Sequence, residues 1–413
     1  MARDSMYNST VNSDPPTHLP SLDTLRGLAC LAVVLLHTFP STYRSRSNAI
    51  IPPRLSANYV ALVWQHVGYQ GVSLFLVLSG FCLYYPMVRR SSGNGKLSLD
   101  VKRFALRRAR RILPPYYAAL VIFVAWDAFV AVRPSHMPMV KIPMAMFQHI
   151  TGEWVNLVTH LFMLHNLFPA TVVSFDGPFW SLALESQLYV IFPALVFFFS
   201  RYGAQRTALL SGVLSMLWQI GCRAHFGNHF TEFPIIGSVW YALPARFFEF
   251  VCGMWAAEVV TWHYRDNKTN HRAGLIALAL VPLALLCSIP AEEICIPGRF
   301  IVWGAMFACI VVVVTTTSST VFWNSAIMRW FTSIGVFSYS LYLVHFPIIG
   351  FVNSKLEAHH FGFVILTGLR IGIMAACIGI AYCFHLAFER PFMNTKPRPS
   401  RHHTVAELAP GTE

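Results

Sequence analysis

Apolar stretches long enough to cross a lipid bilayer recur along this chain of 413 residues. A helix rises about 1.5 Å per residue and the hydrocarbon layer is about 30 Å thick, so a spanning helix needs roughly 17–25 mainly apolar residues. Ten stretches come close to this length: residues 22–40, 66–86, 113–132, 178–200, 206–220, 240–260, 274–290, 299–317, 331–352 and 362–387. They predict an all-α, polytopic membrane protein with ten transmembrane helices.

The composition agrees with this fold class. Hydrophobic residues make up 55% of the chain and charged residues only 12%, and the mean hydropathy is +0.52. These values exclude an ordinary soluble domain. One further apolar segment, 154–170, is short and contains His160, His165 and Asn166. We therefore expect an extra interfacial or re-entrant helix there instead of an eleventh span.

Lysine and arginine residues set the expected orientation, because cytoplasmic loops carry an excess of them. The loop between the second and third spans holds nine basic residues and one acid, Asp100, and is therefore placed inside. Ten spans then put both termini in the cytoplasm. We expect one transmembrane domain at 21–393 between flexible cytoplasmic ends at 1–20 and 394–413, without a cleavable signal. The net charge of +13 is then a topology signal, and no nucleic-acid partner is expected.

Arg26 and His37 lie eleven residues apart in the first span. Eleven helical steps bring both side chains to one face, about 16 Å apart along the axis. An ionisable group inside a bilayer costs roughly 3 kcal/mol, so such residues usually face a polar interior and mark function. The alternative is structural, with Arg26 as an inner-end anchor and His37 as a hydrogen-bonding residue near the outer end.

Polar residues follow single faces of two other spans, namely Ser181, Glu185 and Tyr189 in the fourth and Ser338, Tyr342 and His345 in the ninth. A carboxylate in such a place suits a proton acceptor or a partner that orients a histidine, or it bonds a neighbouring helix. His345 equally suits helix packing. In the sixth span Arg246 and Glu249 are three residues apart, and a structural ion pair is the leading interpretation.

The predicted topology separates these groups by depth. Arg26 and the basic loop lie at the inner side, whereas His37, Glu185 and His345 lie in the outer half of the membrane. This arrangement predicts a pathway with an anion-binding mouth at the cytoplasm and a chamber carrying a base further out.

The order of these residues resembles the acyltransferase 3 membrane family. The segment 22–29 followed by His37 is similar to the family's opening, in which ten residues separate an arginine from a histidine. The segments 71–81 and 107–116 resemble its second span and its basic loop. Further similar positions are His165 with Asn166, Trp180–Ser181–Leu182 with Glu185, Arg246 with Glu249, the segment 338–345 and the closing segment 389–392. In this order and spacing the matches are highly specific, and they cover most of the chain.

The resemblance implies transfer of an acyl group, often acetyl, from cytoplasmic acyl-CoA to a hydroxyl, commonly on a sugar of a surface glycan or its lipid-linked precursor. It makes His37 the general base or a transient acyl carrier, with Glu185 orienting or recharging it and Arg26 near the donor entry. The donor's phosphates suit the guanidinium groups of Arg107, Arg108, Arg110 and Arg111, unless this cluster only sets topology. The residues expected for the acceptor or its pathway are Trp180, Ser181, Tyr189, Tyr342, His345, Arg246 and Glu249. No metal is expected.

The same resemblance predicts an integral protein of the cytoplasmic (inner) membrane of a bacterium, in contact with membrane lipid. Some family members carry a fused extracytoplasmic esterase-like domain. We expect none here, so any hand-over to such a unit needs a separate partner. Two other functions stay open: a proton-coupled secondary transporter or exporter, and a sensor that binds acyl-CoA without turnover. The transporter ranks lower because the chain lacks paired Gly/Pro-interrupted half-helices in two similar halves.

Overall fold

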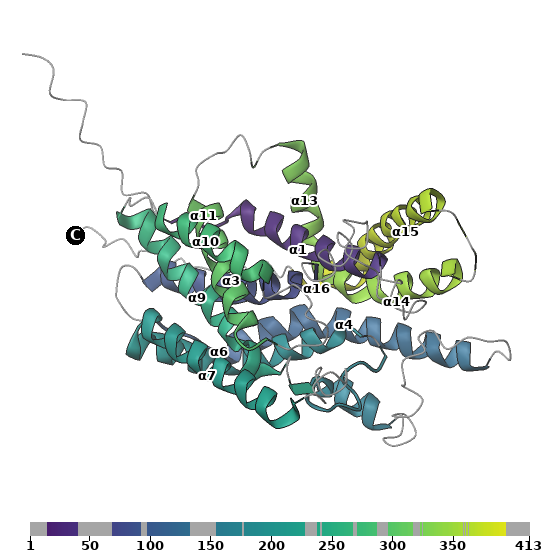
Figure 1. Ribbon diagram of the computed structural model, residues 1–413, viewed down its shortest axis with the longest axis horizontal. Coiled ribbons are helices and arrows are strands. Elements are labelled where there is room, and N and C mark those ends of the chain that lie inside the picture. Colours follow the sequence, from purple (N-terminus) through teal and green to yellow (C-terminus); the bar gives the residue numbers. More distant parts are fainter. Residues whose placement is uncertain are drawn as a thin grey trace, which may run out of the picture.

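The computed structural model of the protein consists of helices packed against one another (Figure 1). It describes residues 15–39, 68–91, 97–132, 154–175, 177–227, 238–239, 242–266, 271–286, 296–316, 323, 325–357, 359, 361 and 363–393. No strand occurs within these residues. Nearly all of the two ends expected to be flexible, 1–20 and 394–413, lies outside them.

The helices follow the apolar stretches of the sequence. They are α1 (Pro20–Thr38), α3 (Gly71–Ser91), α4 (Val101–Val132), η2 (His165–Leu167), α6 (Phe179–Tyr202), α7 (Ala204–Phe226), α9 (Leu243–Asp266), α10 (His271–Leu286), α11 (Arg299–Thr316), α13 (Ala326–Val336), α14 (Ser338–Glu357), α15 (Phe363–Phe384), η5 (His385–Glu389) and α16 (Arg390–Met393). Five described helices are long and apolar enough to cross a membrane: α1, α3, α6, α11 and the continuous stretch Val364–Met393. The protein is therefore a polytopic membrane protein. The total of ten spans and the side of the termini stay predictions.

The span expected at 331–352 is not one straight helix. α13 ends at Val336 and α14 begins at Ser338, and the two helices are bent by 78°. The Ser338 hydroxyl donates a hydrogen bond of 2.9 Å to the carbonyl of Gly335 at this corner. Gly335 also lies against α1, where an added Cβ would be only 1.8 Å from the carbonyl oxygen of Asp23. The expectation of a single straight helix across 331–352 was wrong, because hydropathy does not report a bend between two apolar helices.

The segment expected to be interfacial or re-entrant contains a helix only at 154–161, followed by the turn of η2. This helix is about 12 Å long, too short to cross a bilayer. The hydroxyls of Tyr116 and Tyr117 on α4 donate to the carbonyls of His160 and Leu161, at 3.1 and 2.8 Å. The ring of His160 stacks on that of His165 at 3.9 Å. Burial lowers the pKa of His160 to about 4.

Two glycines allow α3 and α9 to cross at very short distance. On α3, an added Cβ at Gly80 would lie 2.0 Å from the carbonyl oxygen of Phe250, and on α9 one at Gly253 would lie 1.9 Å from that of Val77. Small residues at such crossings let two backbones pack directly, which is the usual basis of helix association in membranes. The close contact with α9 therefore holds α3 in place, and α3 lines the site described next.

The outer faces of the helices are apolar. Val190 on α6 and Val364 on α15 are 79% and 80% exposed, and Leu209 on α7 is 69% exposed. A soluble protein rarely leaves so many large apolar side chains uncovered. These faces agree with contact to membrane lipid.

Candidate active site

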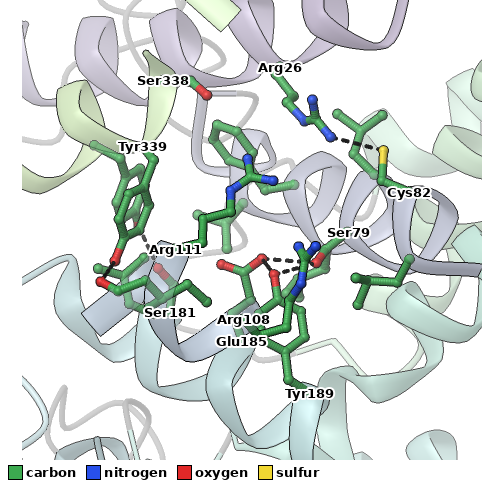
Figure 2. Close-up of a pocket in the computed structure, with 18 residues that line it drawn as sticks. Arg26, Ser79, Cys82, Arg108, Arg111, Ser181, Glu185, Tyr189, Ser338 and Tyr339 are labelled. Atoms are coloured by element: carbon green, nitrogen blue, oxygen red, sulfur yellow. Dashed lines mark hydrogen bonds between the residues drawn. The ribbon is translucent and has the colours of Figure 1, made fainter. Parts of the chain in front are cut away.

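A cavity of about 110 Å³ lies between α1, α3, α4, α6 and α14. Figure 2 shows its polar side chains gathered around one space. The lining residues are Arg26, Val72, Phe75, Leu76, Leu78, Ser79, Cys82, Leu83, Arg108, Arg111, Ile112, Ser181, Leu182, Glu185, Tyr189, Ser338, Tyr339 and Tyr342. Seven of them are site residues predicted from the sequence: Arg26, Arg108, Arg111, Ser181, Glu185, Tyr189 and Tyr342.

Glu185 is the acidic group of this cavity. One of its carboxylate oxygens, Oε1, accepts a hydrogen bond of 2.9 Å from the hydroxyl of Ser79 and a second, short one from the hydroxyl of Tyr189. The two hydroxyls are 3.0 Å apart, and Figure 2 draws all three contacts. Glu185 and Tyr189 reach the same space because four residues are about one helical turn. The structure therefore surrounds this carboxylate with hydroxyl groups and not with a histidine.

Three guanidinium groups line the cavity with this carboxylate. Arg26 lies 2.5 Å from Asp23 on α1 and donates from Nη2 to the sulfur of Cys82 on α3, at 2.9 Å. Arg108 and Arg111 are three residues apart on α4, so they share one face of that helix. Asp23 offsets the charge of Arg26, and Arg108 and Arg111 against Glu185 still leave an excess of positive charge, which favours an anionic ligand.

The structure divides the four arginines of the basic loop into two pairs. Arg108 and Arg111 line the cavity, whereas Arg107 and Arg110 are exposed and do not line it. A helix turns by about 100° per residue, so four arginines within five positions cannot all face one side. Only the inner pair is placed to contact a ligand in this cavity.

His37 and His345 do not line the cavity and are connected to it through Tyr342. The Tyr342 hydroxyl, at its edge, is 2.6 Å from the hydroxyl of Ser181. Nδ1 of His345 is 2.7 Å from the backbone carbonyl of Tyr342, and Nε2 of His345 is 3.0 Å from Nδ1 of His37. His37 therefore has His345 as its side-chain partner, and no described hydrogen bond joins it to Glu185.

Arg246 and Glu249 form a separate buried cluster. Both are 0% exposed, and the guanidinium donates to the carboxylate twice, from Nε at 2.8 Å and from Nη2 at 3.0 Å. Nη2 also donates to the hydroxyl of Ser73, at 2.8 Å. The ring of Trp180 lies 5.6 Å from this guanidinium and stacks on Tyr69. None of these residues lines the cavity, and the ion pair has the structural geometry that the sequence indicated.

Two residues on α3 that contact the polar groups of the cavity were not singled out from the sequence, Ser79 and Cys82. With Phe75 they occur at intervals of four and three residues on α3, so one helix face presents all three to the cavity. This spacing was visible in the sequence. The missing signal was charge, because a serine and a cysteine inside an apolar helix are ordinary small packing residues. Among the described residues, no cluster of three or more His, Cys, Asp or Glu could hold a metal ion.

Comparison with known proteins identifies the family of this chain. A family model described as an acyltransferase domain matches residues 19–386. The chain belongs to the acyltransferase 3 family. No solved structure matches it.

Several bacterial proteins of known name are similar to this acyltransferase 3 chain. The peptidoglycan O-acetyltransferase OatA of Listeria monocytogenes is 26% identical over 362 residues, covering 82% of this chain and 51% of OatA. YrhL of Bacillus subtilis, named as a candidate peptidoglycan O-acetyltransferase, is 25% identical over 406 residues, or 94% of this chain and 56% of YrhL. A candidate O-acetyltransferase of Staphylococcus aureus is 22% identical, covering 82% of this chain and 52% of that protein. The chain spans about half the length of these relatives.

Proposed function

We propose that this protein is a membrane O-acyltransferase that moves an acetyl group from acetyl-CoA, delivered at the cytoplasmic face, to a hydroxyl of a sugar-containing acceptor. The observation that carries the proposal is the cavity that Arg26, Arg108 and Arg111 line together with Glu185. Membership of the acyltransferase 3 family gives the reaction class.

The inner pair of arginines supports an acyl-CoA donor. Coenzyme A carries a pyrophosphate and a further phosphate, and guanidinium groups bind phosphate oxygens bidentately. Arg108 and Arg111 lie near the N-terminal end of α4, while the cavity itself is small. We assign the donor's phosphates to Arg108 and Arg111, so the pantetheine arm carries the thioester beyond these two residues, toward His37.

The transfer needs a base for the acceptor hydroxyl. The hydroxyl oxygen bonds to the thioester carbonyl carbon, the carbon–sulfur bond breaks, and coenzyme A leaves as a thiolate that takes up the proton from the base. We assign the base to His37. It is connected to the cavity by contacts from Tyr342 to His345 and from His345 to His37. Glu185, with the hydroxyls of Ser79 and Tyr189, is placed to assist proton movement inside the cavity.

The acceptor proposed is a glycan of the bacterial envelope, and the location proposed is the cytoplasmic membrane. The name of OatA, a peptidoglycan O-acetyltransferase, and that of YrhL, a candidate one, support this choice. A separate extracytoplasmic partner is proposed for any further step at the outer surface.

The decisive experiment measures release of free coenzyme A from acetyl-CoA by purified protein, with and without peptidoglycan fragments. We expect acceptor-dependent release by the wild type, a loss of at least about 10²-fold in His37→Ala, and a raised KM for acetyl-CoA in Arg111→Ala. Arg110→Ala, on the exposed face of the same helix, is the matched control and should behave as wild type.

Each alternative function gives a different outcome. A transporter releases no coenzyme A, and a sensor binds acetyl-CoA without releasing it. In cells, His37→Gln should abolish an O-linked acetyl mass increment on surface glycans while the protein level stays constant. Retention of that increment would remove His37 from the mechanism.

A further inference from the structure

The contact between His37 and His345 determines where their protons lie. Nδ1 of His345 faces the backbone carbonyl oxygen of Tyr342 at 2.7 Å. A carbonyl oxygen only accepts hydrogen bonds, so Nδ1 of His345 carries a hydrogen. In a neutral imidazole the other nitrogen is then an acceptor. Nε2 of His345 therefore accepts from Nδ1 of His37, at 3.0 Å.

We propose that His345 is a positioning residue that holds His37 in the tautomer with its proton on Nδ1 and its lone pair on Nε2. This inference rests on the proposed acyl transfer, in which His37 is the base. A base must present an unprotonated nitrogen, and the hydrogen bond made by the other ring nitrogen decides which one that is. The backbone of Tyr342 thus fixes the tautomer of His345. His345 in turn favours the Nδ1-protonated tautomer of His37, whose ring also hydrogen-bonds the backbone of Val33.

Other contacts from α14 fix the position of the His37 ring, in addition to the contact from His345 that sets its protonated nitrogen. Phe346 packs edge-on against the His37 ring, with centroids 5.0 Å apart and planes at 84°. Asn353, two turns further along α14, donates from Nδ2 to the backbone carbonyls of His37 and Thr38 at the end of α1, at 3.2 and 3.4 Å. These carbonyls have no partner within α1, so Asn353 caps the helix that carries the base.

His345 is not placed to contact a ligand in the cavity. It is 0% exposed and does not line the cavity, whereas Tyr342, one turn earlier, does. Its replacement should therefore slow the chemical step and leave donor binding unchanged. Glu185, which the sequence suggested as the partner of His37, bonds Ser79 and Tyr189 instead.

The test combines nitrogen NMR of histidine-labelled protein with steady-state kinetics. His37 is assigned as the signal lost in His37→Gln. In the wild type we expect the protonated nitrogen of His37 to be Nδ1. His345→Phe should raise the fraction of His37 that is protonated on Nε2 and lower kcat by at least about 10²-fold, with an unchanged KM for acetyl-CoA. His345→Gln should keep the wild-type tautomer and recover most of kcat, because its side-chain carbonyl can accept from Nδ1.

The exposed His359, near the C-terminal end of α14, is the matched control. His359→Phe should leave the His37 signal and both kinetic constants unchanged. A wild-type His37 protonated on Nε2 would overturn the proposal, even if no variant of His345 folds. So would equal kcat losses in the Phe and Gln variants at wild-type thermal stability. The NMR result does not depend on activity, so an inactive wild type would contradict the proposed function and leave the tautomer assignment standing.

Discussion

The buried pair of Arg246 and Glu249 allows one stability prediction to be worked out in detail. Glu249→Gln keeps the size and one acceptor oxygen but removes the negative charge. Arg246 then remains fully buried, with its bond to Ser73 at 2.8 Å and its position 4.4 Å from the ring of Phe300. Neither contact neutralises a full positive charge that no longer has water around it.

We expect Glu249→Gln to lower the free energy of unfolding by about 3–5 kcal/mol, the usual cost of leaving one member of a buried ion pair uncompensated. The double variant Arg246→Met/Glu249→Leu should lose less, because two apolar side chains leave no buried charge. Glu258→Gln on the same helix is the matched control. Its carboxylate accepts one hydrogen bond of 2.9 Å from Tyr84 and is partly exposed, so we expect a loss of about 1 kcal/mol.

The measurement is reversible unfolding in mixed detergent micelles, with the helical signal followed against denaturant concentration. Cavity residues are untouched, so the folded fraction of Glu249→Gln should bind acetyl-CoA as the wild type does. A loss below about 1 kcal/mol, or a double variant less stable than Glu249→Gln, would refute the reasoning that an isolated buried charge dominates.

Four further predictions follow from other contacts. Replacing Arg108 or Arg111 by Gln should raise the KM for acetyl-CoA by about 10-fold or more, since a charge-assisted bond contributes about 1.5–3 kcal/mol, whereas Arg107→Gln should change it less than about 2-fold. Titration calorimetry should show weaker donor binding at 1 M than at 0.1 M salt, because the screening length falls from about 10 to 3 Å; equal affinities would exclude phosphate binding by these arginines. Gly253→Ala should destabilise the α3–α9 crossing by about 1–3 kcal/mol, whereas Gly221→Ala, with open space around its Cα, should not be destabilised. Because the pKa of His160 is lowered to about 4, the unfolded chain takes up its proton first as the pH falls from about 6.5. Stability should therefore decrease by roughly 3 kcal/mol between pH 6.5 and 4, and His160→Phe should reduce that decrease.

Patterns within single helices were readable from the sequence. Hydropathy located the helices, and the four-residue spacing of Glu185 and Tyr189 placed both on one face, where they line the cavity. The spacing of Arg246 and Glu249 likewise predicted their ion pair. These features depend on the helical repeat alone, which neighbouring elements do not change.

Contacts between helices were not readable in the same way. The partner of His37 depends on how α14 is rotated against α1, and the sequence suggested Glu185 for that role and not His345. The break at Phe337 has no proline or glycine at that position, and the close approach of the nearby Gly335 to Asp23 on another helix cannot be read from one helix alone. The division of the basic loop into inner and outer arginines also needs the packing of α4 against its neighbours.

On α4, Arg108 and Arg111 face the cavity while Arg107 and Arg110 face outward. This arrangement depends on the number of residues between the arginines and the apolar part of the helix. One residue inserted between Arg111 and Tyr116 would rotate the upstream turns by about 100° relative to the bundle. Arg108 and Arg111 would leave the cavity although every side chain, and the total basic charge that orients the loop, would be retained. Natural variation in this segment should consequently take the form of exchanges of residue type at constant length.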